Sequence, residues 1–178
     1  MARVNNIYRS PLRYPGGKTC IYRFVTKLLE NNDMVGINYA EPYAGGAGLA
    51  LRLMMDEYVN EIFINDLDPS IYAFWYAVLN TPDELCKWIE NVEVSVRQWE
   101  IYKDVQRRYK TADMLELAKS TFFLNRTNVS GVISGGPIGG FAQKGKYKID
   151  VRFNKSELIK RIQDIAIFAH RIHLSNHD

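Results

Sequence analysis

Cysteine is scarce in this chain, and long apolar runs are missing from it. The two cysteines among its 178 residues, Cys20 and Cys86, are too few for a disulfide scaffold and indicate a reducing compartment such as the cytoplasm. No apolar run approaches the roughly 20 residues of a membrane-spanning helix. Residues 1–10 are polar and lack the apolar centre of a signal peptide. We therefore expect a cytoplasmic protein without a membrane partner, and both cysteines at least half-buried on helix faces.

Histidine is also scarce, and it stands in one group near the C-terminus. His170, His173 and His177 are spaced closely enough to suggest a metal site. A strand at this position would turn His170 and His173 to opposite faces, and no cysteine or carboxylate cluster accompanies them. We therefore predict no metal site.

The net charge is small, and its distribution is more informative than its sum. A formal net charge of +3 permits a nucleic-acid partner without requiring one. Lys144, Lys146 and Lys148 cluster in a glycine-rich segment, residues 127–153, which we expect to form a long loop or irregular hairpin. Such long loops are usually functional, and this mixture of residues suits contact with a polyanion. A solvated surface loop is the alternative interpretation.

The chain is organised around a glycine turn over residues 39–48. An apolar run over residues 34–40 predicts a strand before the turn, and residues 49–55 predict a helix after it. A second predicted strand over residues 61–65 ends next to Asp66. This order is typical of nucleoside-cofactor binding, in which glycines admit the ligand and the later acid accepts ribose hydroxyls. An ordinary tight turn between strand and helix is the alternative.

A second glycine turn precedes the first predicted helix, over residues 18–30. The sequence Arg13-Tyr-Pro-Gly-Gly-Lys18 fails as a P-loop, because Leu12 stands where a glycine is needed and no strand comes before it. A glycine turn at a helix start still favours an anion, and Lys18 adds a positive charge.

Three consecutive helix signals without a strand divide the chain. Capping sequences begin at Thr81, Ser95 and Asp113, after a helix capped by Asp68. We predict an α/β part over residues 1–80, a mostly helical insertion over residues 81–153, and a return to the α/β part over residues 154–178. The last part holds a helix capped by Asn154 and a third strand over residues 171–175.

Five motifs in this order resemble the Dam-type DNA adenine methyltransferases. They are Arg13–Lys18, Glu41–Gly48, Asn65–Asp66, Phe122–Thr127 and Tyr147–Asn154. The resemblance implies methyl transfer from S-adenosylmethionine to the exocyclic amino group of adenine in a specific sequence of double-stranded DNA. It also implies a Rossmann-like methyltransferase sheet, an inserted target-recognition subdomain, and a bacterial or phage-encoded, nucleoid-associated protein.

The resemblance carries over two sets of site residues. The expected cofactor-binding residues are Tyr14, Gly17, Lys18, Glu41, Pro42, Tyr43, Gly45, Gly46, Gly48 and Asp66. The expected DNA-binding residues are Arg126, Asn128, Ser130, Lys144, Lys146 and Lys148. Base-reading residues vary among members of the family, so the target sequence does not follow.

The sequence departs from the family at its catalytic motif. Asp-Pro-Pro-Tyr, which in the family stands on a fourth strand, occurs nowhere in the 178 residues, and Asp68-Pro69 is followed by Ser70. We therefore expect a partial sheet truncated before that strand, no catalytic residue, and an inactive isolated chain. A complementing chain that carries the catalytic half, or a homodimer, would cover the open edge.

Two other functions are weighed against the methyltransferase. A truncated, inactive paralogue that binds DNA or the cofactor would use the same motifs. A dinucleotide-dependent oxidoreductase is disfavoured, because Gly45-Gly46-Ala47-Gly48 is not the Gly-x-Gly-x-x-Gly fingerprint.

Overall fold

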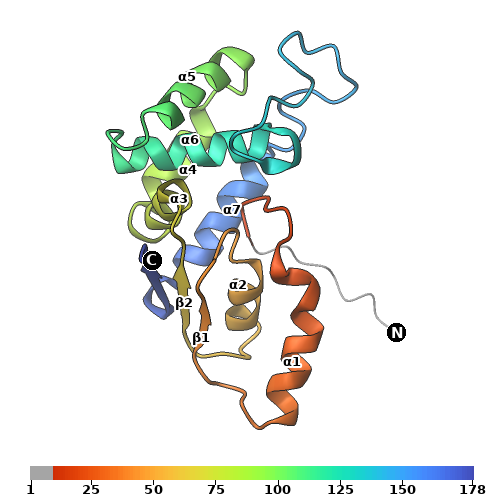
Figure 1. Ribbon diagram of the computed structural model, residues 1–178, viewed down its shortest axis with the longest axis vertical. Coiled ribbons are helices and arrows are strands. Elements are labelled where there is room, and N and C mark those ends of the chain that lie inside the picture. Colours follow the sequence, from red (N-terminus) through yellow and green to blue (C-terminus); the bar gives the residue numbers. More distant parts are fainter. Residues whose placement is uncertain (1–9) are drawn as a thin grey trace.

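A small parallel sheet carries the rest of the chain in the computed structural model, which describes residues 10–178 (Figure 1). Its strands are β1 (Tyr39–Glu41), β2 (Ile62–Asn65) and β3 (Ile172–Ser175), in the order β1-β2-β3. Tyr39 lies opposite Ile62, and Ile62 lies opposite Ile172. The prediction of a mixed α/β fold is confirmed, and the second and third strands lie on one side of the first.

Helices cover one face of this sheet and extend beyond one end of it (Figure 1). The α-helices are α1 (Tyr22–Asn31), α2 (Gly48–Met55), α3 (Pro69–Asn80), α4 (Pro82–Asn91), α5 (Val96–Arg107), α6 (Met114–Thr127) and α7 (Lys155–Ala166). Short 3-10 turns are η1 (Lys18–Ile21), η2 (Val129–Gly131) and η3 (Ala169–Arg171). In Figure 1, α2 lies between the strands and α1, whereas α4, α5 and α6 gather at the far end.

One hydrophobic core runs through both groups of helices. Its buried residues come from α2 and β2 as well as from α3, α4, α5 and α6. The rings of Phe74 on α3 and Phe122 on α6 stack with their centroids 5.5 Å apart. The helical segment over residues 81–153 is therefore tied into the core through α6, while its separate role as a target-recognition insertion stays a prediction.

Most predicted helix caps are present. Asp68 accepts a hydrogen bond from Ser70 N at 2.8 Å, Ser95 accepts one from Gln98 N at 3.2 Å, and Asp113 caps α6. The capping box at Thr81 is wrong, because this residue also ends α3 and its hydroxyl donates back to Ala77 O. Helix α4 nevertheless begins at the next residue, since proline suits the first helical position.

Three expectations near the N-terminus need correction. The helix predicted over residues 18–30 opens as the 3-10 turn η1, and its apolar residues Phe24 and Leu28 are 66% and 49% exposed. Cys20 is exposed, whereas Cys86 is buried as expected. The strand predicted over residues 34–40 begins only at Tyr39, because the preceding backbone turns at Gly36, which has a φ of +90°.

The sheet has an open face and an open edge within residues 10–178. Ala40, Phe63 and His173 point to one face and are exposed, and β1 pairs on one side only. Parallel sheets are normally covered on both faces. None of the helices over residues 10–178 is long and apolar enough to span a membrane.

Candidate nucleotide and nucleic-acid site

The two glycine turns pack directly against each other at the carboxyl end of β1. A Cβ atom on Gly45 would lie 2.8 Å from the Tyr14 ring, and one on Gly48 would lie 2.5 Å from the hydroxyl of Thr19. These glycines therefore permit close approach of the segment that holds Tyr14 and Thr19. Gly45 also adopts a φ of +49°. The expectation that glycines admit a ligand accounts for only part of their role.

An ion pair joins the two turns. Lys18 Nζ lies 3.2 Å from Glu41 Oε2 and donates to Tyr43 O at 2.6 Å. Glu41 is 2% exposed and accepts a hydrogen bond from Ala50 N, in the first turn of α2. Burial raises the pKa of Glu41, while Lys18 and the hydrogen bond from Ala50 lower it. The carboxylate thus stabilises the start of α2 from inside the fold.

Asp66, the residue after β2, holds two backbone segments: the glycine turn at Gly45 and the residues that lead into α3. Its Oδ2 accepts from Gly45 N at 2.7 Å, and its Oδ1 accepts from Asp68 N at 3.1 Å. Trp75 Nε1 donates to Gly45 O at 2.9 Å and anchors the same turn to α3. A carboxylate has about four lone-pair sites, so Asp66 retains acceptor capacity.

Four of the remaining expected cofactor residues present accessible surface at the same place, whereas Gly46 is buried against Tyr14. Tyr14 is 48% exposed and Tyr43 is 79% exposed, and Pro42 and Gly17 are exposed beside them. The pKa of Tyr14 is raised by burial and by the nearby charges of Asp66 and Asp68. The fold thus brings together the residues expected at the cofactor.

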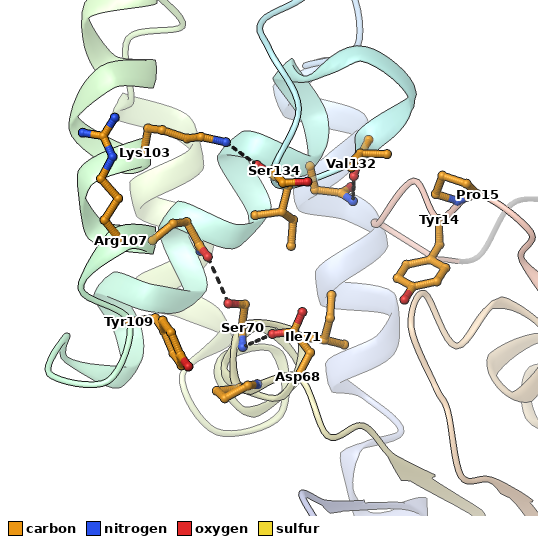
Figure 2. Close-up of a pocket in the computed structure, with 15 residues that line it drawn as sticks. Tyr14, Pro15, Asp68, Ser70, Ile71, Lys103, Arg107, Tyr109, Val132 and Ser134 are labelled. Atoms are coloured by element: carbon orange, nitrogen blue, oxygen red, sulfur yellow. Dashed lines mark hydrogen bonds between the residues drawn. The ribbon is translucent and has the colours of Figure 1, made fainter.

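A cavity of about 730 Å³ opens beside these expected cofactor residues (Figure 2). Tyr14 and Pro15 of the Arg13–Lys18 turn line it, and the start of α3 lines it opposite them. Lys103 and Arg107 of α5 line another wall, and the sequence analysis assigned neither of them to a site. Their four-residue spacing puts both on one helix face, which is the signal that could have identified them. Lys103 Nζ also donates to Ile133 O at 2.9 Å and so holds the segment after η2.

The expected DNA-binding residues divide into buried and exposed groups. Asn128 is 0% exposed, accepts from Trp99 Nε1 at 2.6 Å and donates to Val132 O and Ile133 O. Arg126 donates to backbone carbonyls and is only partly exposed. The exposed members are Ser130, Lys144, Lys146 and Lys148.

The glycine-rich segment is irregular but internally bonded. It holds η2 and a single antiparallel bridge between Asn128 and Pro137. Gln143 donates to Ile138 O and accepts from Ile149 N, and Lys148 Nζ donates to Gln143 O. A loop without strands was one of the two predicted forms, and its side-chain bonds give it a defined path, with residues 141–152 projecting from the helical end (Figure 1).

Comparison with known families agrees with this arrangement. The model of the D12 class N6 adenine-specific DNA methyltransferases matches residues 14–178. The chain belongs to this family. No curated protein matches the chain. The predicted Dam-type resemblance is thereby confirmed, and membership of the D12 family indicates adenine in DNA as the substrate class.

Proposed function

We propose that this chain supplies the cofactor-binding and DNA-binding parts of an adenine-specific DNA methyltransferase. The supporting observation is the convergence of the Arg13–Lys18 turn, the glycine turn and Asp66 at the carboxyl ends of β1 and β2. Ligands of open parallel sheets bind at this end of the strands. The methyl group goes to the exocyclic amino group of adenine, which must be flipped out of the duplex to be reached.

The residues present fit S-adenosylmethionine. Asp66 keeps free acceptor capacity for ribose hydroxyls, Tyr14 and Tyr43 offer exposed rings, and the Lys18 ammonium lies within the cluster. The cofactor supplies an electrophilic methyl group when it is bound. Lys18 and Asp66 hold the two glycine turns that would bind it, and Tyr14 belongs both to these turns and to the lining of the 730 Å³ cavity.

The 730 Å³ cavity suits the flipped base. Its size lies within the range of small-molecule sites. Tyr14 provides a ring for stacking, while Ser70 and Gln106 line the opposite wall and bond to each other at 3.0 Å. Arg107 also lines this wall, but its guanidinium points away from Tyr14 (Figure 2) and lies 4.0 Å from the Asp104 carboxylate.

The alternative function is DNA or cofactor binding without catalysis. It would use the same motifs, and Asp-Pro-Pro-Tyr does not occur among the 178 residues. We propose that a complementing chain with that motif, or a second copy of this chain, pairs with the open edge of β1. Ile21, Phe24 and Leu28 of η1 and α1 are also exposed apolar residues, but α2 lies between α1 and the strands (Figure 1).

Replacing Asp66 by alanine should weaken S-adenosylmethionine binding by about 1–3 kcal/mol, because ribose hydroxyls would lose a charged acceptor. Calorimetric titration of the 178-residue chain measures this change. Asp83→Ala removes an exposed carboxylate on α4 and serves as the matched control. Since Asp66 also holds Gly45 and Asp68, thermal unfolding must show that the variant is folded. Unchanged affinity in a folded variant would remove Asp66 from the cofactor site.

Neutralising Lys144, Lys146 and Lys148 together should flatten the salt dependence of DNA binding. The slope of log K against log salt should fall by up to about 0.9 for each lost phosphate contact. A triple alanine variant at three exposed lysines on α1, α4 and α7, Lys27, Lys87 and Lys160, is the control. Fluorescence anisotropy with a duplex at several salt concentrations gives the slope. A loop variant with the wild-type slope would make residues 127–153 an ordinary surface loop.

A further inference from the structure

Four arginines converge on a second cavity, which Tyr14 also lines. This cavity has a volume of about 630 Å³ and also borders Gly46 and Gly48, at the start of α2. Its arginines come from four separate parts of the sequence, namely Arg13, Arg126, Arg152 and Arg161. The positive end of the α2 dipole faces the same space. A concentration of positive charge of this kind needs a physical explanation.

The hydrogen bonds of these arginines leave most of their donors unused. Arg126 donates from Nε to Arg152 O at 2.8 Å and from Nη1 to Pro11 O at 3.4 Å. Arg161 Nη1 donates to Ser10 O at 2.9 Å. Arg13 Nη1 donates to Asn128 O at 3.3 Å. Apart from the Glu157 carboxylate, which pairs with Arg161, the acceptors are neutral carbonyls, and each guanidinium has five N–H donors. The bonds hold the N-terminal segment in place and leave donors for a ligand.

The positive charge is poorly compensated. Within residues 10–178, Glu157 is the acid in ion-pair contact with this cluster, and it pairs with Arg161. The guanidinium of Arg152 makes no hydrogen bond or ion pair with any of those residues. Burial and the charges of Arg13 and Arg161 lower the pKa of Arg126 to about 10. A bound anion would relieve this repulsion.

We propose that the four-arginine cavity binds a phosphate group of the DNA backbone. Guanidinium groups match the bidentate geometry of phosphate oxygens, and arginine is the usual residue for such recognition. Arg152 belongs to the same glycine-rich segment as Lys146 and Lys148. One strand of the DNA would therefore run from the loop to the cavity. This choice of ligand rests on the proposed DNA-binding function, whereas the cavity itself fits any phosphate.

The first test is Arg152→Gln, because Arg152 is exposed and its side chain makes no bond within residues 10–178 whose loss would unfold the chain. Binding of a 20-base-pair duplex of arbitrary sequence should weaken, and its salt slope should fall by about 0.9 for the lost contact. Arg97→Gln removes an exposed arginine on α5 as the matched control and should leave the slope unchanged. A wild-type slope and affinity in Arg152→Gln would overturn the proposal.

Cys20 provides an independent measurement because it is exposed and lines the same cavity. Burial raises the pKa of Cys86 to about 11, so maleimide at pH 7 should label only Cys20. The duplex should slow this labelling at least 10-fold in the wild type and less in Arg152→Gln. Inorganic phosphate and S-adenosylmethionine are tested in parallel.

The outcomes separate this proposal from the proposed function. Protection by inorganic phosphate but not by duplex identifies a free-anion site, and protection by S-adenosylmethionine alone identifies a cofactor site; each overturns the proposal. If the loop-lysine variant loses salt dependence while Arg152→Gln does not, the DNA-binding function stands and this cavity has no part in it. Absence of any duplex binding by the wild type would overturn both.

Discussion

A polypeptide of these 178 residues is expected to transfer no methyl group from S-adenosylmethionine to DNA. The target amino group needs a nearby acceptor, but Glu41 and Asp66 serve other contacts, and the remaining acceptor capacity of Asp66 is the part expected to take ribose hydroxyls. Glu41 is buried against Lys18 and Ala50, and Asp66 holds Gly45. Incorporation of labelled methyl groups into an adenine-containing duplex measures the activity, and the expected value is the background without protein.

Activity should return when a second polypeptide carrying the Asp-Pro-Pro-Tyr strand is supplied. A version of that polypeptide with Ala in place of the motif's Asp is the control and should restore nothing. Labelled adenine produced by the 178-residue polypeptide alone would refute the assignment of catalysis to a strand outside these residues. Catalysis by another residue of this chain would then have to be sought.

The same polypeptide is expected to associate through its sheet. β1 pairs on one side only within residues 10–178, and Ala40 and Phe63 expose the adjoining face. An uncovered strand edge recruits another strand, in a partner or in a second copy. Sedimentation of the isolated chain should reveal a dimer or larger species, and amide exchange should be slow at β1. A stable monomer with freely exchanging β1 amides would contradict this expectation.

Asn125→Ala should be the most destabilising of the substitutions considered, lowering the free energy of unfolding by about 2–4 kcal/mol. Asn125 is 1% exposed. Its Oδ1 accepts from Arg13 N at 2.7 Å, and its Nδ2 donates to Arg13 O at 2.7 Å and to Gly131 O at 2.9 Å. Truncation leaves these backbone groups without partners. Urea denaturation monitored by circular dichroism measures the change.

Two further variants sharpen this test. Asn91→Ala removes an exposed amide on α4 that bonds only within its own helix, and it should change stability by less than about 0.5 kcal/mol. Asn125→Asp keeps the acceptor for Arg13 N but loses both donors, so it should be clearly destabilising too. A loss below about 1 kcal/mol in Asn125→Ala would show that the contact contributes little to holding the Arg13–Lys18 turn.

Local signals in the sequence predicted the elements well because they act over a few residues. Asp68 followed by Pro69 marks a helix start, since the carboxylate bonds the next turn and proline suits the first position. The order of strand, glycine turn and helix around Gly45 was readable for the same reason. Where two elements competed for one residue, as at Thr81, the local pattern predicted the wrong hydrogen bond.

The sequence by itself determined the family, the order of the motifs and the parallel sheet, because motif spacing and periodicity are properties of the chain alone. Tertiary structure decided which motif residues are free. Arg13 and Asn125, 112 positions apart, bond to each other, and Asn128 turns inward to Trp99. The tertiary structure also gathers four arginines around one cavity: Arg13, Arg126, Arg152 and Arg161. Contacts over such separations depend on how all the helices pack together, and no local pattern encodes them.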